Sequence, residues 1–349
     1  MSSHLEPALE HLRWLVRADS QNPPRTPEAL VARLQAELAA AFDVERTDSG
    51  HGCVALFARR GSPRVLFNFH VDTVPVSAGW TRDPFELAVG RDRAVGLGAC
   101  DTKGAAAAML AVALASKADV ALLFTTDEEA GQGRCVRDFC AKKLPFELVV
   151  VAEPTEAHAV LAHRGVGTGM LAFHGTAAHS SAAGGSSANH ALVRWASAAL
   201  AWAETHGDVR FNVGRVEGGL KPNVVAAEAM ARFGVRPPPT ESPNDVLLAL
   251  ARLAEDDAVY TDGFLGPPLR ETAKARTLAT SYGLPVGAAV DFWTEAALFA
   301  DAGYAAMVLG AGSIAQAHGA DEFVSLGDLT RLTDLYHRIL HSPPPPETR

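Results

Sequence analysis

The sequence predicts an α/β fold in which a mostly parallel sheet is flanked by helices, with a smaller α+β unit inserted into it. Three observations predict this fold. Short apolar runs without alternation are separated by helical patterns, as in sheets covered on both faces. In the middle of the chain, longer strand patterns surround one long helical pattern instead. At 349 residues, the chain is also long enough for two structural units.

The larger predicted unit is formed by both ends of the chain. Leucines and valines at steps of three and four residues predict helices near 5–16 and 30–38. Further elements follow in order along the chain. Apolar runs predict strands at 65–71, 120–125, 148–152 and 306–309, and the patterns between and after them predict helices at 103–116, 134–142, 294–302 and 326–340.

The inserted unit has its own order of elements. Strands are predicted at 165–175, 209–218 and 224–235, and helices at 186–205 and 246–253. We therefore expect one domain made of residues 1–164 and 277–349, and a second domain made of residues 165–276.

Composition and charge argue against several classes of protein. The 31 basic and 40 acidic residues give a net charge of −9, which argues against a nucleic-acid partner. No apolar run approaches the ~18 residues of a membrane span, and the first residues lack the pattern of a signal peptide. Four cysteines in so long a chain cannot form a disulfide framework. We expect a soluble, acidic protein of the cytoplasm without a membrane partner.

Polar side chains occupy the carboxyl end of the first apolar strand. Alternation along residues 65–72 puts Asn68, His70 and Asp72 on one face. A buried strand that becomes polar at its end costs stability unless these groups are paired or bind a ligand. The other strands run into similar groups, and in an open α/β sheet ligands bind at the carboxyl ends of the strands. The acids and imidazoles expected at this edge are His70, Asp72, Asp101, Asp127, Glu128, Glu129, Glu153 and His318.

Each of these residues, taken alone, has an ordinary structural explanation. His70 and His318 could be satisfied core or surface histidines, Asp101 a helix cap, and 127–129 a solvated loop. Their convergence favours a metal site, because crowded carboxylates repel one another unless a cation neutralises them. Histidines and carboxylates without a thiolate favour Zn²⁺, Co²⁺ or Mn²⁺ over an iron–sulfur centre, and two imidazoles argue against Mg²⁺ or Ca²⁺.

Five stretches together resemble the co-catalytic zinc deacylases and exopeptidases, a family that includes acetylornithine deacetylase, succinyl-diaminopimelate desuccinylase and glutamate carboxypeptidase. The segment 310–318 is most similar to the acetylornithine deacetylase branch, and 161–165 and 290–296 resemble its acetylcitrulline-deacetylating members. Family members often carry Pro where this chain has Ala311, which bears on loop stiffness rather than ligation. The five stretches, which run in order over essentially the whole chain, are 70–75, 96–104, 127–129, 152–155 and 316–318.

The resemblance implies a zinc-exopeptidase catalytic domain and an inserted lid and dimerisation domain. It also implies one or two ions of Zn²⁺ or Co²⁺ per subunit, with Asp101 bridging the two sites. Three carboxylates and one hydroxide would balance the charge of two divalent ions. The first ion would be held by His70, Asp101 and Glu153, and the second by Asp101, Glu129 and His318.

Four further residues receive roles from the same resemblance. Asp72 would orient the imidazole of His70, and Glu128 would be the general base. In the inserted domain, Asn223 and Arg236 match positions that contact the carboxylate end of the substrate, although Arg236 could equally be a surface charge at a strand end.

His179 is the last residue that the resemblance singles out. From spacing alone, it is an exposed loop histidine that caps the helix near residue 186. The family, however, places a histidine here that reaches into the active site of the partner subunit. A neutral imidazole donating from Nε2 would stabilise the oxyanion of the tetrahedral intermediate.

The resemblance thus implies a metallo-amidohydrolase. Its substrate would be N-acetyl-L-ornithine or N-acetyl-L-citrulline, hydrolysed to acetate and the free amino acid in arginine biosynthesis by a cytoplasmic homodimer. The sequence leaves ornithine and citrulline open. Another family activity (desuccinylase, aminoacylase or dipeptidase) is the alternative within enzymes. A metal-dependent binding protein is the alternative outside them, and the intact 127–129 and both histidines count against it.

Overall fold

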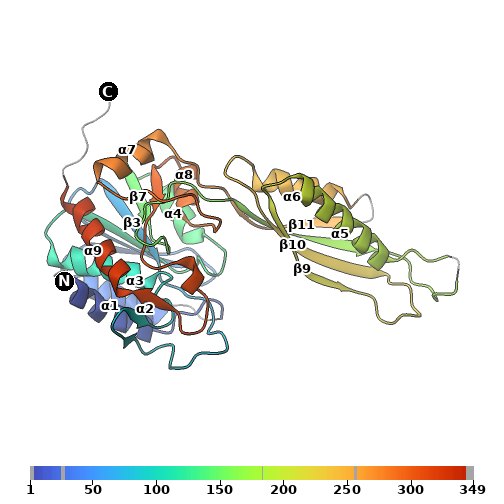
Figure 1. Ribbon diagram of the computed structural model, residues 1–349, viewed down its shortest axis with the longest axis horizontal. Coiled ribbons are helices and arrows are strands. Elements are labelled where there is room, and N and C mark those ends of the chain that lie inside the picture. Colours follow the sequence, from blue (N-terminus) through green and yellow to red (C-terminus); the bar gives the residue numbers. More distant parts are fainter. Residues whose placement is uncertain (1–3, 25–27, 183, 255–257, 343–349) are drawn as a thin grey trace. The chain divides into compact units, whose positions relative to one another are not determined.

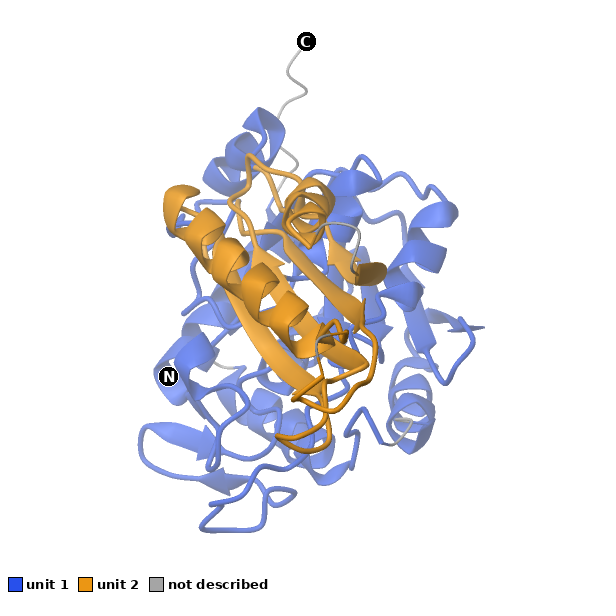
Figure 2. Cartoon of the chain, turned by 90° about the vertical axis from the view of Figure 1, so that its right-hand side faces the viewer, with its two compact units in different colours: residues 1–161, 271–289, 294–349 blue, residues 162–270, 290–293 orange. Residues whose placement is uncertain are grey.

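The computed structural model describes residues 4–24, 28–182, 184–254 and 258–342, and the chain forms two compact units (Figures 1 and 2). Unit 1 contains Met1–Leu161, Glu271–Ala289 and Thr294–Arg349. Unit 2 contains Ala162–Arg270 and Val290–Trp293. The short segment Val290–Trp293 was not expected in the inserted unit. It belongs there because Val290 pairs with His163 and the Trp293 ring packs edge-on against Phe264.

Unit 1 is built on a six-stranded sheet with the order β1-β2-β6-β3-β7-β12. The four strands β6, β3, β7 and β12 are parallel, which confirms the predicted mostly parallel sheet. β1 and β2 add an antiparallel edge that was not expected. The strands are β1 (Asp43–Asp48), β2 (Val54–Arg60), β3 (Val65–His70), β6 (Val120–Thr125), β7 (Leu148–Val151) and β12 (Ala306–Val308).

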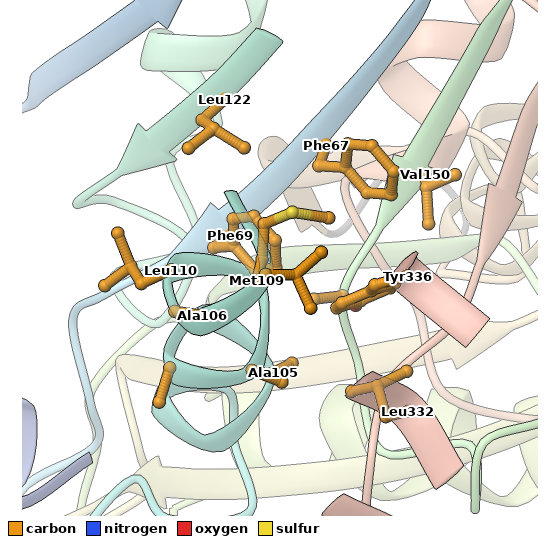
Figure 3. Packing of buried hydrophobic residues seen from close by; sticks show 14 of the residues in the cluster. Phe67, Phe69, Ala105, Ala106, Met109, Leu110, Leu122, Val150, Leu332 and Tyr336 are labelled. Atoms are coloured by element: carbon orange, nitrogen blue, oxygen red, sulfur yellow. The ribbon is translucent and has the colours of Figure 1, made fainter. Parts of the chain in front are cut away.

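One face of this sheet is covered by helices from both ends of the chain. Phe67 and Phe69 of β3 pack on this face against Met109 of α3 (Lys103–Ala115) and Tyr336 of α9 (Leu326–His341), as Figure 3 shows. The alanines of α3 bring that helix close to the sheet, and it is buried from Lys103 to Ala113. The same cluster takes in apolar residues of α1 (Leu5–Arg17), α2 (Glu28–Leu38) and α7 (Ala273–Ser281).

The opposite face carries an aromatic cluster and two short helices. Phe57 of β2 packs against Phe139 of α4 (Arg134–Ala141), and Phe139 packs against Phe299 of α8 (Ala296–Asp301). The sheet is therefore covered on both faces, as its apolar strands predict. A small separate sheet has the order β13-β5-β4, formed by β4 (Ala88–Val89), β5 (Arg93–Val95) and β13 (Phe323–Ser325).

Unit 2 is an antiparallel sheet with the order β11-β8-β10-β9. Two helices, α5 (Ala188–Thr205) and α6 (Pro243–Arg252), lie on one face (Figures 1 and 2). Trp195 of α5 packs there against Phe173 and Phe233, and its indole donates to the backbone oxygen of Leu250. The strands are β8 (Val166–His174), β9 (Arg210–Gly218), β10 (Glu228–Arg236) and β11 (Ala258–Gly266), of which β11 was not expected.

In the part of the chain that the structure describes, no helix is both long enough and apolar enough to span a membrane.

Candidate metal centre

Most of the acids and imidazoles expected at the carboxyl edge of the sheet lie at or just after the ends of the parallel strands of unit 1, whereas Asp101 and His318 lie in loops. His70 is the last residue of β3, and Glu153 follows β7 by two residues. Glu128 and Glu129 follow β6, and Asp101 lies in the loop just before α3. The parallel strands thus bring together residues that are distant in the sequence, as the rule for open α/β sheets predicts.

Three of these residues form a first buried group. Nε2 of His70 lies 2.9 Å from Oδ1 of Asp101 and 3.7 Å from Oε1 of Glu153. At most 5% of each of these residues is exposed to solvent. Their three ligand atoms all lie within 4.8 Å of one another, which is close enough for a single ion to contact all of them.

A second group shares Asp101 with the first. Nε2 of His318 lies 3.2 Å from Oδ2 of Asp101 and 3.1 Å from Oε1 of Glu129. His318 follows a 3₁₀ turn at Ile314–Gln316, and its backbone adopts the left-handed conformation, with φ of 62°. Its side chain is half exposed, so this group lies nearer to solvent than the first.

Asp72 contacts residues of both groups. Its backbone oxygen lies 3.2 Å from Nδ1 of His70, while its carboxylate Oδ1 lies 3.7 Å from the same nitrogen. Oδ2 accepts a hydrogen bond of 3.1 Å from the backbone N–H of Glu129. Asn22 donates to the same oxygen and to the backbone oxygen of Thr126. The carboxylate therefore fixes the Glu129 segment as well as facing the imidazole.

The electrostatics of the site favour a bound cation. Burial raises the pKa of Glu128 and Glu153 well above the usual range, and the neighbouring carboxylates add to the rise. Burial also acts to raise the pKa of Asp101, but hydrogen bonds from His318 and His70 outweigh it and lower that pKa. The hydrogen bonds with Asp101 and Glu129 raise the pKa of His318 to about 10. The carboxylates thus stabilise a positive charge on the imidazoles, as they would stabilise a bound cation.

The donor set fits a divalent metal. It consists of imidazole nitrogens and carboxylate oxygens, without a thiolate, in three overlapping groups of converging ligand atoms. Besides the two groups that share Asp101, His70 also converges with Glu128 and Glu129. Borderline ions such as Zn²⁺ take these donors, and a carboxylate with two free oxygens can contact two ions. An ion would also relieve the repulsion among the buried acids, which is unfavourable without one.

Several residues that support the site were missed in the sequence. Glu322 lies immediately before β13 and is 2% exposed, and its carboxylate accepts hydrogen bonds from the loop that carries Asp101. Glu295 is buried beside Thr125, whose hydroxyl donates to it, and burial raises its pKa to about 8. Asn22, which donates to the Asp72 carboxylate, is the third such residue. No periodicity marks these residues, because their partners are backbone groups or distant side chains.

The remaining predicted site residues lie in unit 2. His179 follows β8 in a loop, and Asn223 lies in the loop between β9 and β10. These two loops meet, because the backbone oxygen of Asn223 accepts from the N–H of Ser180 and His179 pairs with Val224. Arg236 is the exposed last residue of β10. The three residues thus lie at both ends of the central strands of unit 2.

Comparisons with known proteins agree on one family. Residues 66–342 match the sequence profile of Peptidase family M20/M25/M40. An N-acetyl-L-citrulline deacetylase of Xanthomonas campestris is 44% identical, over 98% of this chain and 99% of that protein. An acetylornithine deacetylase of Erwinia tasmaniensis is 31% identical, over 80% of each chain. Among solved structures, a tripeptidase of Staphylococcus aureus shares the fold, with a TM-score of 0.80 at 19% identity over 96% of this chain and 97% of that one.

Proposed function

This chain belongs to Peptidase family M20/M25/M40, and on that premise we propose that it removes the acetyl group from an Nα-acetyl amino acid, with N-acetyl-L-citrulline as its preferred substrate. Family membership confirms the resemblance identified from the five motifs and makes the chain a metal-dependent amide hydrolase. The observation that supports the substrate is 44% identity to an N-acetyl-L-citrulline deacetylase over nearly the whole of both chains. N-acetyl-L-ornithine is the second candidate, and either reaction would serve arginine biosynthesis.

The proposed cofactor is Zn²⁺ or Co²⁺, one or two ions per subunit. His70, Asp101 and Glu153 would hold the first ion, and Asp101, Glu129 and His318 the second, as their two compact groups suggest. Bound ions would polarise the scissile carbonyl and lower the pKa of water from ~16 towards ~7. The lower exposure of the first group favours tighter binding there, since a buried charge gains more from each contact.

Glu128 is the proposed general base. It lies next to the ligand Glu129 at the end of β6, and the burial that raises its pKa makes it a stronger base. In this role it takes a proton from the attacking water and passes it to the leaving amine. Asp72 would keep the His70 imidazole in one orientation, with its backbone oxygen 3.2 Å and its carboxylate 3.7 Å from Nδ1.

Unit 2 is proposed to bind the substrate and to form the dimer interface. Arg236 offers a forked guanidinium to the substrate carboxylate. Asn223, before the opposite end of β10, is the second residue that the family resemblance assigns to this end of the substrate. Two features of this unit suit a homodimer. Val193 and Leu200 of α5 are 62% and 53% exposed, and β9 is an edge strand of its sheet.

His179 is proposed to stabilise the oxyanion in the partner subunit's site. The backbone N–H of Ser181 donates to Nδ1 of His179, and the Ser181 hydroxyl lies 2.7 Å from the same nitrogen. Because Nδ1 accepts a hydrogen bond, the proton of the neutral ring lies on Nε2. This is the tautomer that an oxyanion donor requires.

The proposed function is tested by comparing substrates. We expect kcat/KM of the metal-loaded enzyme to be highest for N-acetyl-L-citrulline, followed by N-acetyl-L-ornithine. N-acetyl-L-methionine and N-succinyl-diaminopimelate should be hydrolysed at least tenfold less efficiently. A preference for the succinyl substrate would assign the chain to the desuccinylases instead. In either case, we propose that the enzyme acts in the cytoplasm.

A further inference from the structure

A buried carboxylate holds the loop that carries Asp101. We propose that Glu322 is a positioning residue of the metal centre, which fixes the bridging carboxylate of Asp101 without binding an ion itself. The inference rests on the proposed metal centre and adds to it a residue outside both groups of ligands.

Three hydrogen bonds carry the inference. The backbone N–H groups of Cys100 and Asp101 donate to Oε1 of Glu322, at 2.9 and 3.0 Å. The N–H of Gly98 donates to Oε2 at 3.1 Å. One side chain thus satisfies three neighbouring donors of one loop, the last of which belongs to Asp101. Buried N–H groups without a partner destabilise the fold, so this loop conformation depends on the carboxylate.

The backbone of Glu322 is also bound to the segment that carries Asp101. Its backbone oxygen accepts a 2.9 Å hydrogen bond from the N–H of Gly96, in the same loop. The next residue, Phe323, begins β13, which pairs with β5 immediately before that loop. Glu322 also follows His318 by four residues, so it connects the segment that carries one ligand with the loop that carries another.

The contacts of Glu322 distinguish it from the ligands. Both of its carboxylate oxygens accept hydrogen bonds from the backbone, and it belongs to none of the three groups of converging ligand atoms. The carboxylate is therefore placed to hold the backbone rather than to bind the metal.

A glutamine at position 322 provides a shape-matched test. It keeps one acceptor oxygen, but its amide nitrogen would face a backbone N–H that also donates, so at least one hydrogen bond is lost. The loop then loses the contact that fixes Asp101. Replacing residues that orient metal ligands typically lowers metal affinity ~10–100-fold. We expect Glu322→Gln to lower the affinity for Zn²⁺ at least tenfold, measured by competition with a chromophoric chelator.

The control is Asp321→Asn. Asp321 is the preceding residue and accepts two hydrogen bonds from Thr81, but none from the loop at 96–101. Its replacement should leave Zn²⁺ affinity within twofold of the parent chain. The absorption spectrum of the Co²⁺-loaded protein adds a readout that a general loss of stability does not change. We expect an altered spectrum for Glu322→Gln and the parental spectrum for Asp321→Asn.

Two results would overturn the inference. One is a folded Glu322→Gln protein whose Zn²⁺ affinity and Co²⁺ spectrum equal those of the parent chain. If that variant does not fold, Glu322→Asp replaces it, because it keeps the charge but shortens the side chain. We expect Glu322→Asp to bind Zn²⁺ at least fivefold more weakly than the parent chain. Unchanged Zn²⁺ affinity in Glu322→Asp is the second result that would overturn the inference. A parent chain that binds no divalent metal would instead refute the proposed metal centre itself, and the inference with it.

Discussion

Oδ1 of Asp101 lies 2.9 Å from Nε2 of His70. The other carboxylate oxygen of Asp101 lies 3.2 Å from Nε2 of His318, so one side chain stands between two imidazoles that come from opposite ends of the chain. This arrangement suits a carboxylate that bridges two ions.

Replacing the bridging residue should therefore affect both proposed metal sites. We expect Asp101→Asn to reduce bound Zn²⁺ to well below one ion per chain, because the amide offers one neutral oxygen where the carboxylate offers two charged ones. Metal content after gel filtration measures this. The exposed Asp92, which pairs with Arg93, provides the control Asp92→Asn. Full metal content in Asp101→Asn would exclude the bridging role.

Glu128 should affect turnover without affecting metal content. Glu128→Gln removes the proton acceptor while keeping the shape of the side chain, and positioned bases typically contribute ~10²–10⁴-fold to the rate. We expect kcat to fall by at least ~10²-fold, with bound metal nearly unchanged. If metal and activity are lost together, Glu128 is a ligand rather than the base.

His179 should contribute to the rate but not to metal binding. A single oxyanion donor is commonly worth ~10²–10³-fold, and we expect His179→Ala to lower kcat at least tenfold with the same metal content. Its action across the dimer has a separate test. Mixing His179→Ala with Glu128→Gln under conditions of subunit exchange should restore activity, because one site of each heterodimer then has both residues. No recovery despite proven exchange would place His179 in its own subunit's site or outside catalysis.

The ion pairs of Arg164 should make unit 2 sensitive to acid. Arg164 donates to Asp291 and Asp208, each at 2.5 Å, and the hydrogen bond from Arg164 lowers the pKa of Asp291. A carboxyl with a lowered pKa in the folded state stabilises the fold above its unfolded pKa of ~3.9, and this contribution is lost as the pH falls through the folded pKa.

We therefore expect Asp291→Asn to lower the free energy of unfolding by on the order of 1 kcal/mol. The substitution removes one of the two carboxylates that pair with the buried guanidinium of Arg164, and Asp291 itself is exposed. Urea unfolding should give the same difference from the parent chain between pH 8 and pH 5, and a smaller one below about pH 4. A difference that shrinks already between pH 8 and pH 6 would assign the effect to another group.

The strand ends explain why much of the site could be predicted from the sequence. His70, Glu128 and Glu153 each follow an apolar run, and the geometry of parallel strands brings such positions to one edge. The edge strand β1 could not be found in this way. Its sequence is mostly charged and its residues are largely exposed, so it has no apolar run, and pairing with β2 defines it.

Residues that act through hydrogen bonds to backbone groups could not be predicted from the sequence pattern. Glu322 acquires its role from N–H groups more than 220 residues away, and no spacing or side-chain chemistry marks it. Val290–Trp293 joins unit 2 for a similar reason, because its partner His163 is distant in the chain. Tertiary contacts of this kind define where unit 2 ends.

The most direct test of the account is a metal titration of the chelator-treated protein, followed by acetate release from N-acetyl-L-citrulline. We expect no turnover without metal, and turnover that rises with added Zn²⁺ or Co²⁺ and saturates when the sites fill. Folded protein that binds the metal but hydrolyses neither this substrate, N-acetyl-L-ornithine, N-acetyl-L-methionine nor N-succinyl-diaminopimelate would contradict it and indicate a metal-dependent binding protein.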